Sequence, residues 1–415
     1  MKRGHLADFF SGVGVKKLSG TELDPRVSKG HEFQGTRVLQ NFLGLPSSPQ
    51  RLPCTYMWLT DDEAPVRHDG TATWYDSRSN QPHRNPEPRL FYTVESEGVV
   101  GLAAEGDSLF VCLRKDARLL ILLCQSGSNI EQQLLWLFGL TSPTTRLIQN
   151  DLRQTEGLRL DFAARQVLEA IEIEVPTSHD QWLEPIFREF GPKFPGTAAF
   201  SAFARRQAQD VSPLTEPDSA LMAWIELEDV MFHTLERHLI DERLRAGFQS
   251  GGKIDVEGFV SFSLSVHGRR KSRAGLSLEH HLASLFEAHG VKFDRNGRTE
   301  GNKQPDFLFP GAVEYHDPAF EPGGLTLLGV KTTCKDRWRQ VLSEGRRVGQ
   351  KHLLTLEAGI SSNQTSEMQA AELQLVVPKP IQSSYSAEQQ GWLNSVGELI
   401  GVIKERAASK NSRDG

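Results

Sequence analysis

The chain has 415 residues, of which 38% are hydrophobic and 24% are charged, and its formal net charge is −6. This composition is typical of a soluble globular protein, and the length predicts two domains rather than one core. No apolar run reaches transmembrane length, and the start at Met1 lacks the apolar stretch of a signal peptide. We therefore expect a cytoplasmic protein with no membrane partner.

Charge is unevenly distributed along the chain. Residues 267–275 hold four Lys or Arg and no acid, and residues 331–347 hold six against two acids. Because local basic faces can coexist with an acidic total, the net charge does not decide whether the protein binds nucleic acid. The four cysteines, at positions 54, 112, 124 and 334, lack paired metal spacing, which predicts buried thiols and no zinc site.

Residues 1–175 are expected to form a barrel-like α+β domain. Apolar runs predict strands at 89–94, 108–113 and 119–124. Helical spacing predicts helices at 36–43, 131–138 and 162–171. Dense Pro and Gly then predict a linker over 176–193, partly docked by aromatic side chains such as Trp182.

A second domain, with a mixed sheet between helices, is expected over 194–406. Its predicted helices cover 220–245 and 277–289, the latter ending in a left-handed cap at Gly290. The remaining predicted elements are strands at 306–309, 325–331, 352–356 and 373–377 and helices at 336–347 and 387–406. The polar residues 407–415 are predicted to be a disordered tail.

Two of these strands each carry one charged residue at an end. The runs around Asp306 and Val330-Lys331 predict neighbouring strands that bring both charges to one sheet edge. A carboxylate there could hold a divalent metal, and the ammonium could offset charge that develops on a phosphodiester under attack. The same pair also occurs as a capping aspartate and a solvated lysine, so the two residues alone leave both interpretations open.

The strings around these residues resemble a known family, the EcoRII-like type IIE restriction endonucleases of the PD-(D/E)XK nuclease superfamily. The resemblance is strong over about residues 180–405 and weaker over the first 175. It is carried by Arg269-Arg270-Lys271-Ser272-Arg273-Ala274-Gly275, Ser277-Leu278-Glu279, Glu300-Gly301-Asn302-Lys303, Pro305-Asp306-Phe307-Leu308-Phe309-Pro310, Tyr315-His316-Asp317 and residues 330–340.

The resemblance implies a catalytic set of Glu279, Asp306, Lys331 and Glu344 that works with Mg²⁺. Asp306 and Glu344 are the implied main metal ligands, and Glu279 is an implied supporting acid, although a glutamate in a first helical turn also serves as a dipole partner. Gly329 stands where many members of the superfamily place the second acid, two residues before the lysine. An ion pair between Glu344 and Arg347 would remove a ligand from the site.

DNA recognition by the second domain is implied for two basic clusters. The triplet Lys335-Asp336-Arg337 matches the family's residues for CC and GG dinucleotides, because Lys or Arg can donate to guanine and a carboxylate can accept from cytosine. A capping aspartate between solvated bases is the alternative. The other cluster is expected to contact phosphates and consists of Arg269, Arg270, Lys271 and Arg273.

In this family the amino-terminal domain resembles the DNA-binding pseudobarrel of plant transcription factors, which grips DNA with two arms. The positions that match those arms are Lys16, Lys17, His31, Arg78, Arg84 and Asn85, although ordinary solvated loop charges are the alternative. The second arm departs from the pattern at Pro82, Pro86 and Pro88, where more basic residues would be expected.

The function that the resemblance implies is Mg²⁺-dependent cleavage of double-stranded DNA at a near-palindromic CC/GG-containing site, similar to CCWGG. A homodimer would cut both strands, a further DNA copy would bind the amino-terminal domains as an effector, and no nucleotide cofactor would be needed. Two alternatives stay open, a DNA-binding regulator on an inactive nuclease fold and a structure-specific repair nuclease.

Overall fold

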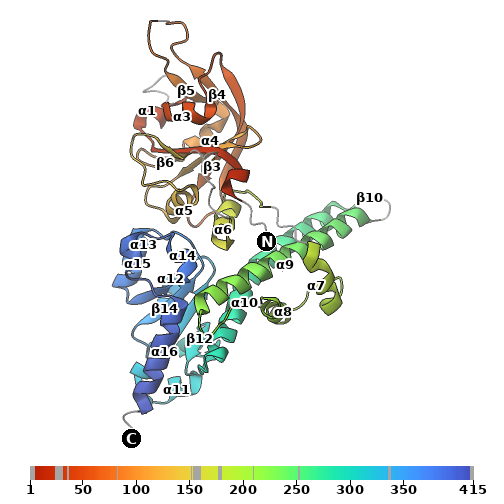
Figure 1. The fold of residues 1–415 in the computed structure, drawn as a ribbon, viewed down its shortest axis with the longest axis vertical. Helices are drawn as coiled ribbons and strands as arrows, with labels where there is room; N and C mark the ends of the chain where they lie inside the picture. Colours follow the sequence, from red (N-terminus) through yellow and green to blue (C-terminus); the bar gives the residue numbers. More distant parts are fainter. Residues whose placement is uncertain are drawn as a thin grey trace. The chain divides into compact units, whose positions relative to one another are not determined.

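The computed structural model describes residues 5–23, 31–34, 37–81, 83–150, 152, 160–175, 180–208, 210–250, 253–334 and 338–411. The chain divides into two compact units (Figure 1), the first formed by residues 1–175 with 358–364 and the second by residues 176–357 with 365–415. Within the described residues, no helix is both long enough and apolar enough to cross a membrane.

The first unit is built on one sheet, which has eight strands within the described residues, in the order β2-β5-β4-β3-β7-β6-β1-β8. Its pairs are antiparallel except for β3 with β7. The strands are β1 (Phe10–Lys17), β2 (Glu32–Gln34), β3 (Gln50–Leu59), β4 (Val66–Asp76), β5 (Pro88–Tyr92), β6 (Ser108–Arg114), β7 (Leu119–Cys124) and β8 (Ile148–Asn150). The helices are η1 (Leu6–Asp8), α1 (Gly20–Leu23), α3 (Arg37–Leu43), η2 (Val94–Ser96), α4 (Glu97–Val100), α5 (Asn129–Phe138) and α6 (Phe162–Ala170).

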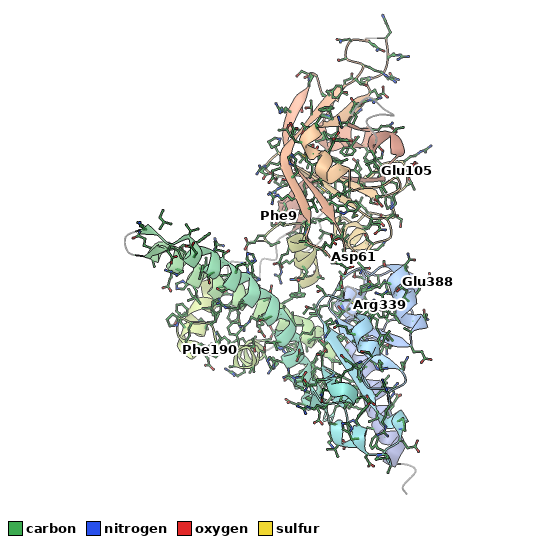
Figure 2. The ribbon with its side chains drawn as sticks, turned by 180° about the vertical axis from the view of Figure 1, so that it is seen from behind. Phe9, Asp61, Glu105, Phe190, Arg339 and Glu388 are labelled. Atoms are coloured by element: carbon green, nitrogen blue, oxygen red, sulfur yellow. The ribbon has the colours of Figure 1, made fainter. Side chains whose placement is uncertain are left out.

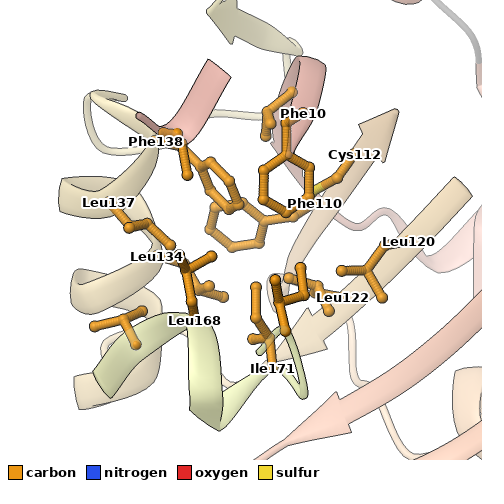
Figure 3. Packing of buried hydrophobic residues seen from close by; sticks show 14 of the residues in the cluster. Phe10, Phe110, Cys112, Leu120, Leu122, Leu134, Leu137, Phe138, Leu168 and Ile171 are labelled. Atoms are coloured by element: carbon orange, nitrogen blue, oxygen red, sulfur yellow. The ribbon is translucent and has the colours of Figure 1, made fainter. Parts of the chain in front are cut away.

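Strand β7 shows why this sheet is covered on both faces. All six of its residues are buried, and they alternate between two separate apolar clusters. Leu120 and Leu122 pack with α5 and α6, where Phe138 lies edge-on to Phe10 at 5.3 Å between ring centroids (Figure 3). Leu119, Ile121 and Leu123 point into the other cluster, beside α3 and α4. A continuous apolar run is what a strand buried on both faces requires.

The second unit begins with helices in the range that was predicted to be a linker. The described part of that range contains η3 (Asp180–Trp182) and α7 (Leu183–Phe190). Phe190, labelled in Figure 2, packs against Phe200 and Phe203 of α8 (Thr197–Gln207), at 5.9 and 5.4 Å between ring centroids. Aromatic burial therefore keeps these residues within the second unit despite their many prolines and glycines.

Two long helices, α9 (Pro217–Ala246) and α10 (Val256–Ala288), pack against each other and are joined through β9 (Gln249–Ser250) and β10 (Lys253–Ile254) (Figure 1). The predicted start of the second helix at Ser277 is wrong, because α10 continues through Gly268 and Gly275. A Cβ at either glycine would meet nothing within 4 Å, so no close packing requires a glycine at these positions. The cap is confirmed, since Gly290 has φ +67°.

The sheet of the second unit is mixed, as predicted, with the order β11-β12-β13-β14-β15. β11 (Asp294–Arg295), β12 (Phe307–Phe309) and β13 (Thr326–Lys331) pair antiparallel, whereas β14 (Lys351–Thr355) and β15 (Leu373–Val376) continue in parallel. The helices around it are η4 (Glu300–Asn302), α11 (Ala312–His316), η5 (Pro322–Gly324), α12 (Trp338–Leu342), α13 (Ser362–Ala370), α14 (Lys379–Gln382), α15 (Ala387–Gln390) and α16 (Val396–Asn411).

Two predicted helices differ from the structure in their bounds. The helix predicted over 336–347 ends at Leu342, because Gly345 adopts φ +59° and turns the chain. The helix predicted over 387–406 is two helices, α15 and α16, separated by a bridge between Asn394 and Val376. The second of these runs to Asn411 and so includes part of the predicted tail, while residues 412–415 lie outside the described residues.

Candidate active site

Asp306 and Lys331 meet where two neighbouring strands place them. Asp306 directly precedes β12 and Lys331 ends β13, and these strands pair antiparallel with Phe307 opposite Leu328. The Lys331 Nζ lies 3.0 Å from Asp306 Oδ2, which also accepts the N–H of Val330 at 2.6 Å. The prediction that adjacent strands deliver both charges to one sheet edge is confirmed. Within the described residues, Asp306 Oδ1 receives no hydrogen bond.

Glu344 lies close to this pair, in the turn that follows α12. Burial raises the pKa of its carboxyl group, and the negative charge of Asp306 raises it further. The ammonium group of Lys331 acts in the opposite direction but does not cancel the shift. Arg347 is not its partner in the described contacts, since that guanidinium donates to backbone carbonyls, including the carbonyl of Asp317 at 2.8 Å.

Two further lysines surround Glu344 that the sequence did not identify as site residues. Lys303 and Lys351 both lower the pKa of the Glu344 carboxyl group by their charge. Burial lowers the pKa of the Lys351 ammonium group. The available signal was Gly301-Asn302 ahead of Lys303, which predicts a loop but not its contact with the turn that carries Glu344.

The donor set suits a divalent cation that takes few protein ligands. The carboxylates of Asp306 and Glu344 repel each other, and a bound cation would relieve that repulsion. Asp306 has one oxygen without a hydrogen-bond donor in the described residues, and Glu344 has a raised pKa. Mg²⁺ accepts one or two carboxylates and completes its shell with water. In the described part of the chain, no three His, Cys, Asp or Glu side chains form a group that could hold a metal.

Glu279 has a different immediate partner. Its Oε2 accepts a hydrogen bond from Arg295 Nη2 at 2.7 Å, and Arg295 lies on β11 opposite Phe307. The Arg295 backbone therefore neighbours the strand that follows Asp306, and the carboxylate of Glu279 is neutralised by the arginine. Its role as a third metal ligand stays a prediction.

The residues that were expected to contact DNA from the second unit are placed unevenly. Lys335, Asp336 and Arg337 lie outside the described residues, as does the side chain of Lys271. Arg269 stacks over the ring of Phe194, at 4.0 Å from the guanidinium carbon to the ring centroid. The Arg270 Nε donates to Glu236 Oε2 at 2.7 Å. Arg269 therefore joins α10 to the loop between α7 and α8, and Arg270 joins α10 to α9.

Arg273 requires a correction. It is buried, its Nη2 donates to the buried carboxylate of Glu228 at 3.2 Å, and its guanidinium stacks over Phe200 and Phe232. His281 Nε2 lies 3.0 Å from the other oxygen of Glu228. A guanidinium held in this way supports the packing of α8, α9 and α10 and does not reach a phosphate.

The six predicted effector contacts also differ in exposure. Arg84 and Asn85 are exposed in the loop between β4 and β5, where Arg78 is half-buried and pairs with Glu87 at 2.8 Å. His31 is also half-buried, with its Nδ1 3.1 Å from Glu97 Oε1.

Lys16 and Lys17 point inward from β1. The Lys16 prediction is corrected, because its buried Nζ bonds both oxygens of Glu22 at 2.7 Å. Lys17 Nζ lies 2.5 Å from Glu131 Oε1 and also donates to the hydroxyls of Ser108 and Ser126. Both ammonium groups are therefore engaged within the first unit, and the exposed contact candidates are those of the second arm.

This chain is similar to several known proteins. Residues 232–400 match the family model described as EcoRII C terminal. The type II restriction enzyme EcoRII of Escherichia coli is 32% identical over 338 residues, which cover 81% of this chain and 79% of that enzyme. The type II restriction enzyme SsoII of Shigella sonnei is 28% identical over 124 residues, 28% of this chain and 40% of that enzyme. The structure of metal-depleted Ecl18kI with uncleaved, modified DNA is similar at a TM-score of 0.44 and 19% identity, covering 57% of this chain and 87% of the other.

Proposed function

This chain belongs to the EcoRII family of type II restriction endonucleases, and we propose that its cleavage of DNA is performed by Asp306, Lys331 and Glu344 with Mg²⁺. The observation that carries the proposal is the meeting of Lys331 Nζ with Asp306 Oδ2 at 3.0 Å beside a second carboxylate of raised pKa. Asp306 and Glu344 would hold the ion, which when bound supplies a polarised phosphoryl oxygen and a more acidic water.

Side chains and backbone groups of this chain would supply the other catalytic functions. Asp306 orients the Lys331 ammonium group by accepting from it, and the N–H of Val330 holds the carboxylate itself in place. The ammonium would face the scissile phosphate, donate to the attacking water and offset negative charge on the phosphoryl oxygens in the transition state. Both charged side chains are only partly exposed, at 24% for Lys331 and 18% for Asp306, which strengthens their interaction with a bound phosphate.

Sequence recognition would use the triplet Lys335-Asp336-Arg337, which follows the strand that ends in Lys331 by only a few residues. A basic-acidic-basic triplet can read adjacent G·C pairs in the major groove, which fits a CC/GG-containing, CCWGG-like site. Cys334, the residue directly before the triplet, donates its N–H to the buried carboxylate of Glu357.

A near-palindromic site calls for a two-fold dimer. Apolar side chains are exposed on the helical hairpin of α9 and α10, and a second copy would remove them from water. They are Leu244, Ile254, Val256, Phe259, Val260 and Leu264, exposed by 48–80%. Sedimentation should show a homodimer, and Leu264→Glu should shift it toward monomer.

The first unit would act as an effector domain, a pseudobarrel that binds a further DNA copy. The support is the loop between β4 and β5, where Arg84 and Asn85 are exposed. An Arg84→Ala variant should need a higher concentration of effector duplex for full stimulation of cleavage. Unchanged dependence on the duplex would count against this loop as the contact.

Digestion of a sequenced plasmid tests the whole proposal. With Mg²⁺ we expect discrete fragments whose ends map to one short near-palindromic sequence, and without the ion we expect none. Binding without cleavage would favour the regulator on an inactive nuclease fold. Cleavage at junctions or mismatches in any sequence would favour the repair nuclease.

A further inference from the structure

The turn that carries Glu344 is held more tightly than a surface turn needs to be. The N–H of Glu344 donates to the carbonyl of Val341 at 3.1 Å. Gly345 follows at φ +59°, a conformation that favours glycine. A Cβ at Gly345 would come within 2.6 Å of the Leu327 side chain, which is buried on β13. The turn is therefore seated directly on the strand that ends in Lys331.

The loop of residues 299–303 braces this turn on both sides of Glu344. Lys303 Nζ donates to the carbonyl of Ser343 at 2.8 Å, and Glu300 Oε2 accepts the N–H of Arg346 at 3.2 Å. The loop itself is fixed, because the Thr299 N–H donates to the carbonyl of Lys303 at 2.8 Å. Its tip consists of two successive left-handed residues, Gly301 and Asn302.

A second set of contacts ties the far end of the turn to the same loop. The Arg347 guanidinium donates to the backbone carbonyls of Tyr315, Asp317 and Phe320. The Tyr315 hydroxyl in turn donates to Glu300 Oε1 at 2.5 Å. Burial alone would raise the pKa of the Glu300 carboxyl, but the hydrogen bonds from Tyr315 and from the backbone lower it, so the anionic acceptor is favoured.

These contacts have a consequence for the metal. Asp306 is placed by a strand, whereas Glu344 is placed by a turn outside regular structure. Two ligands share one ion only when their separation is held, and groups around the ligands commonly set that geometry. We propose that Glu300, Lys303 and Arg347 are positioning residues that hold Glu344 at the distance from Asp306 that a shared divalent cation needs. This inference rests on the proposed function.

One substitution distinguishes a positioning role from a purely electrostatic one, because the two roles predict opposite changes in metal affinity. Removing the Lys303 ammonium group by Lys303→Met takes a positive charge away from the site, which on charge alone would strengthen cation binding. Loss of the brace instead predicts an affinity for Mn²⁺, measured by calorimetry on the full chain, that is about tenfold weaker. The Mg²⁺ concentration for half-maximal plasmid cleavage should rise by a similar factor. Lys303→Arg, which keeps a donor, should restore both values.

The matched control is Lys292→Met. Lys292 is an exposed lysine of the same unit whose partner, Glu314, lies outside the brace, and its variant should leave both metal values unchanged. Glu300→Ala should weaken Mn²⁺ binding in the same way, and its melting temperature shows whether it is folded. Because Lys303 is exposed, its variant tests the inference even if Glu300→Ala unfolds.

The outcomes are distinguishable. If the unaltered chain neither binds Mn²⁺ nor cleaves DNA, the proposed function fails. If it does both and Lys303→Met binds Mn²⁺ as tightly as the unaltered chain or more tightly, the function stands and the positioning role is overturned.

Discussion

Each unit of this protein has a lysine near the end of a strand, paired with a carboxylate, and the two pairs are built differently. In the first unit, the Lys16 and Glu22 side chains are exposed by only 5% and 1%. Glu22 also accepts hydrogen bonds from Ser19 and from the N–H of Gln34. In the second unit, the corresponding exposures of Lys331 and Asp306 are 24% and 18%.

The number of hydrogen-bond partners distinguishes the structural pair Lys16–Glu22, the first pair, from the reactive pair Lys331–Asp306, the second pair. Each oxygen of Glu22 is saturated by donors from its own unit, so no ligand can replace them without cost. Asp306 instead takes its described hydrogen bonds on one oxygen and has Glu344 as a like-charged neighbour. A site that leaves charge incompletely satisfied is prepared for a ligand.

The largest expected effect is on chemistry at the second pair. Asp306→Ala or Lys331→Ala should lower the rate of plasmid cleavage on the order of 10³-fold, as expected when a group that stabilises transition-state charge is removed. Both variants should still bind a specific duplex in a gel-shift assay. Cleavage retained by either variant would mean that the pair is not catalytic.

Substitution at the first pair should affect stability instead. Lys16→Met leaves the buried carboxylate of Glu22 without its cation, so we expect a loss of about 3 kcal/mol in the free energy of unfolding. Urea denaturation measures the change, with Lys331→Met as the control that should unfold near the unaltered midpoint. An unchanged midpoint for Lys16→Met would contradict the structural role that we assign to the Lys16–Glu22 pair.

A smaller effect is expected on base discrimination by the triplet Lys335-Asp336-Arg337, which follows Lys331 in the sequence. Arg337→Ala should lower discrimination at one G·C position by about 2 kcal/mol, the typical contribution of a bidentate contact to guanine. Competition between duplexes with single base changes measures it. The same sequence preference in the variant would count against the triplet.

The smallest effect concerns the stability of the metal-free protein. Because the folded state raises the pKa of Glu344, it binds more protons than the unfolded chain between the two pKa values, and stability falls as pH rises through that window. Glu344→Gln removes this cost, so it should raise the melting temperature at pH 7 by about 2 °C. The gain should vanish at a pH below the ordinary carboxyl range; a gain that persists there would have another cause.

The sequence predicted the second pair, although its residues are 25 positions apart, because each residue lies at the end of a recognisable apolar run. Two short apolar runs with strand character, each with one charge at an end, were enough to place Asp306 beside Lys331. The inward direction of Lys16 depends on Glu22 across a turn, and the burial of Arg273 depends on Glu228, 45 residues away on another helix. Side-chain contacts of this kind, whether they span 6 residues or 45, leave no periodic signal in the sequence.

Boundaries failed for a related reason. Gly345 signals the end of a helix, but the apolar spacing of the residues before it favoured a longer one, so Glu344 was predicted on a helix and lies in a turn. The second helix was predicted to start at Ser277, but α10 starts at Val256 and packs against α9. The brace around Glu344 could not be predicted, because it joins three segments through backbone carbonyls and N–H groups that carry no residue-specific pattern.

The most direct test of the central claim is the affinity of the full chain for Mn²⁺, measured by electron paramagnetic resonance on the unaltered protein, Asp306→Asn and Glu344→Gln. If the two carboxylates share one ion, each substitution alone should weaken binding at least about tenfold. Binding as tight in both variants as in the unaltered protein would contradict the claim that Asp306 and Glu344 form a single metal site.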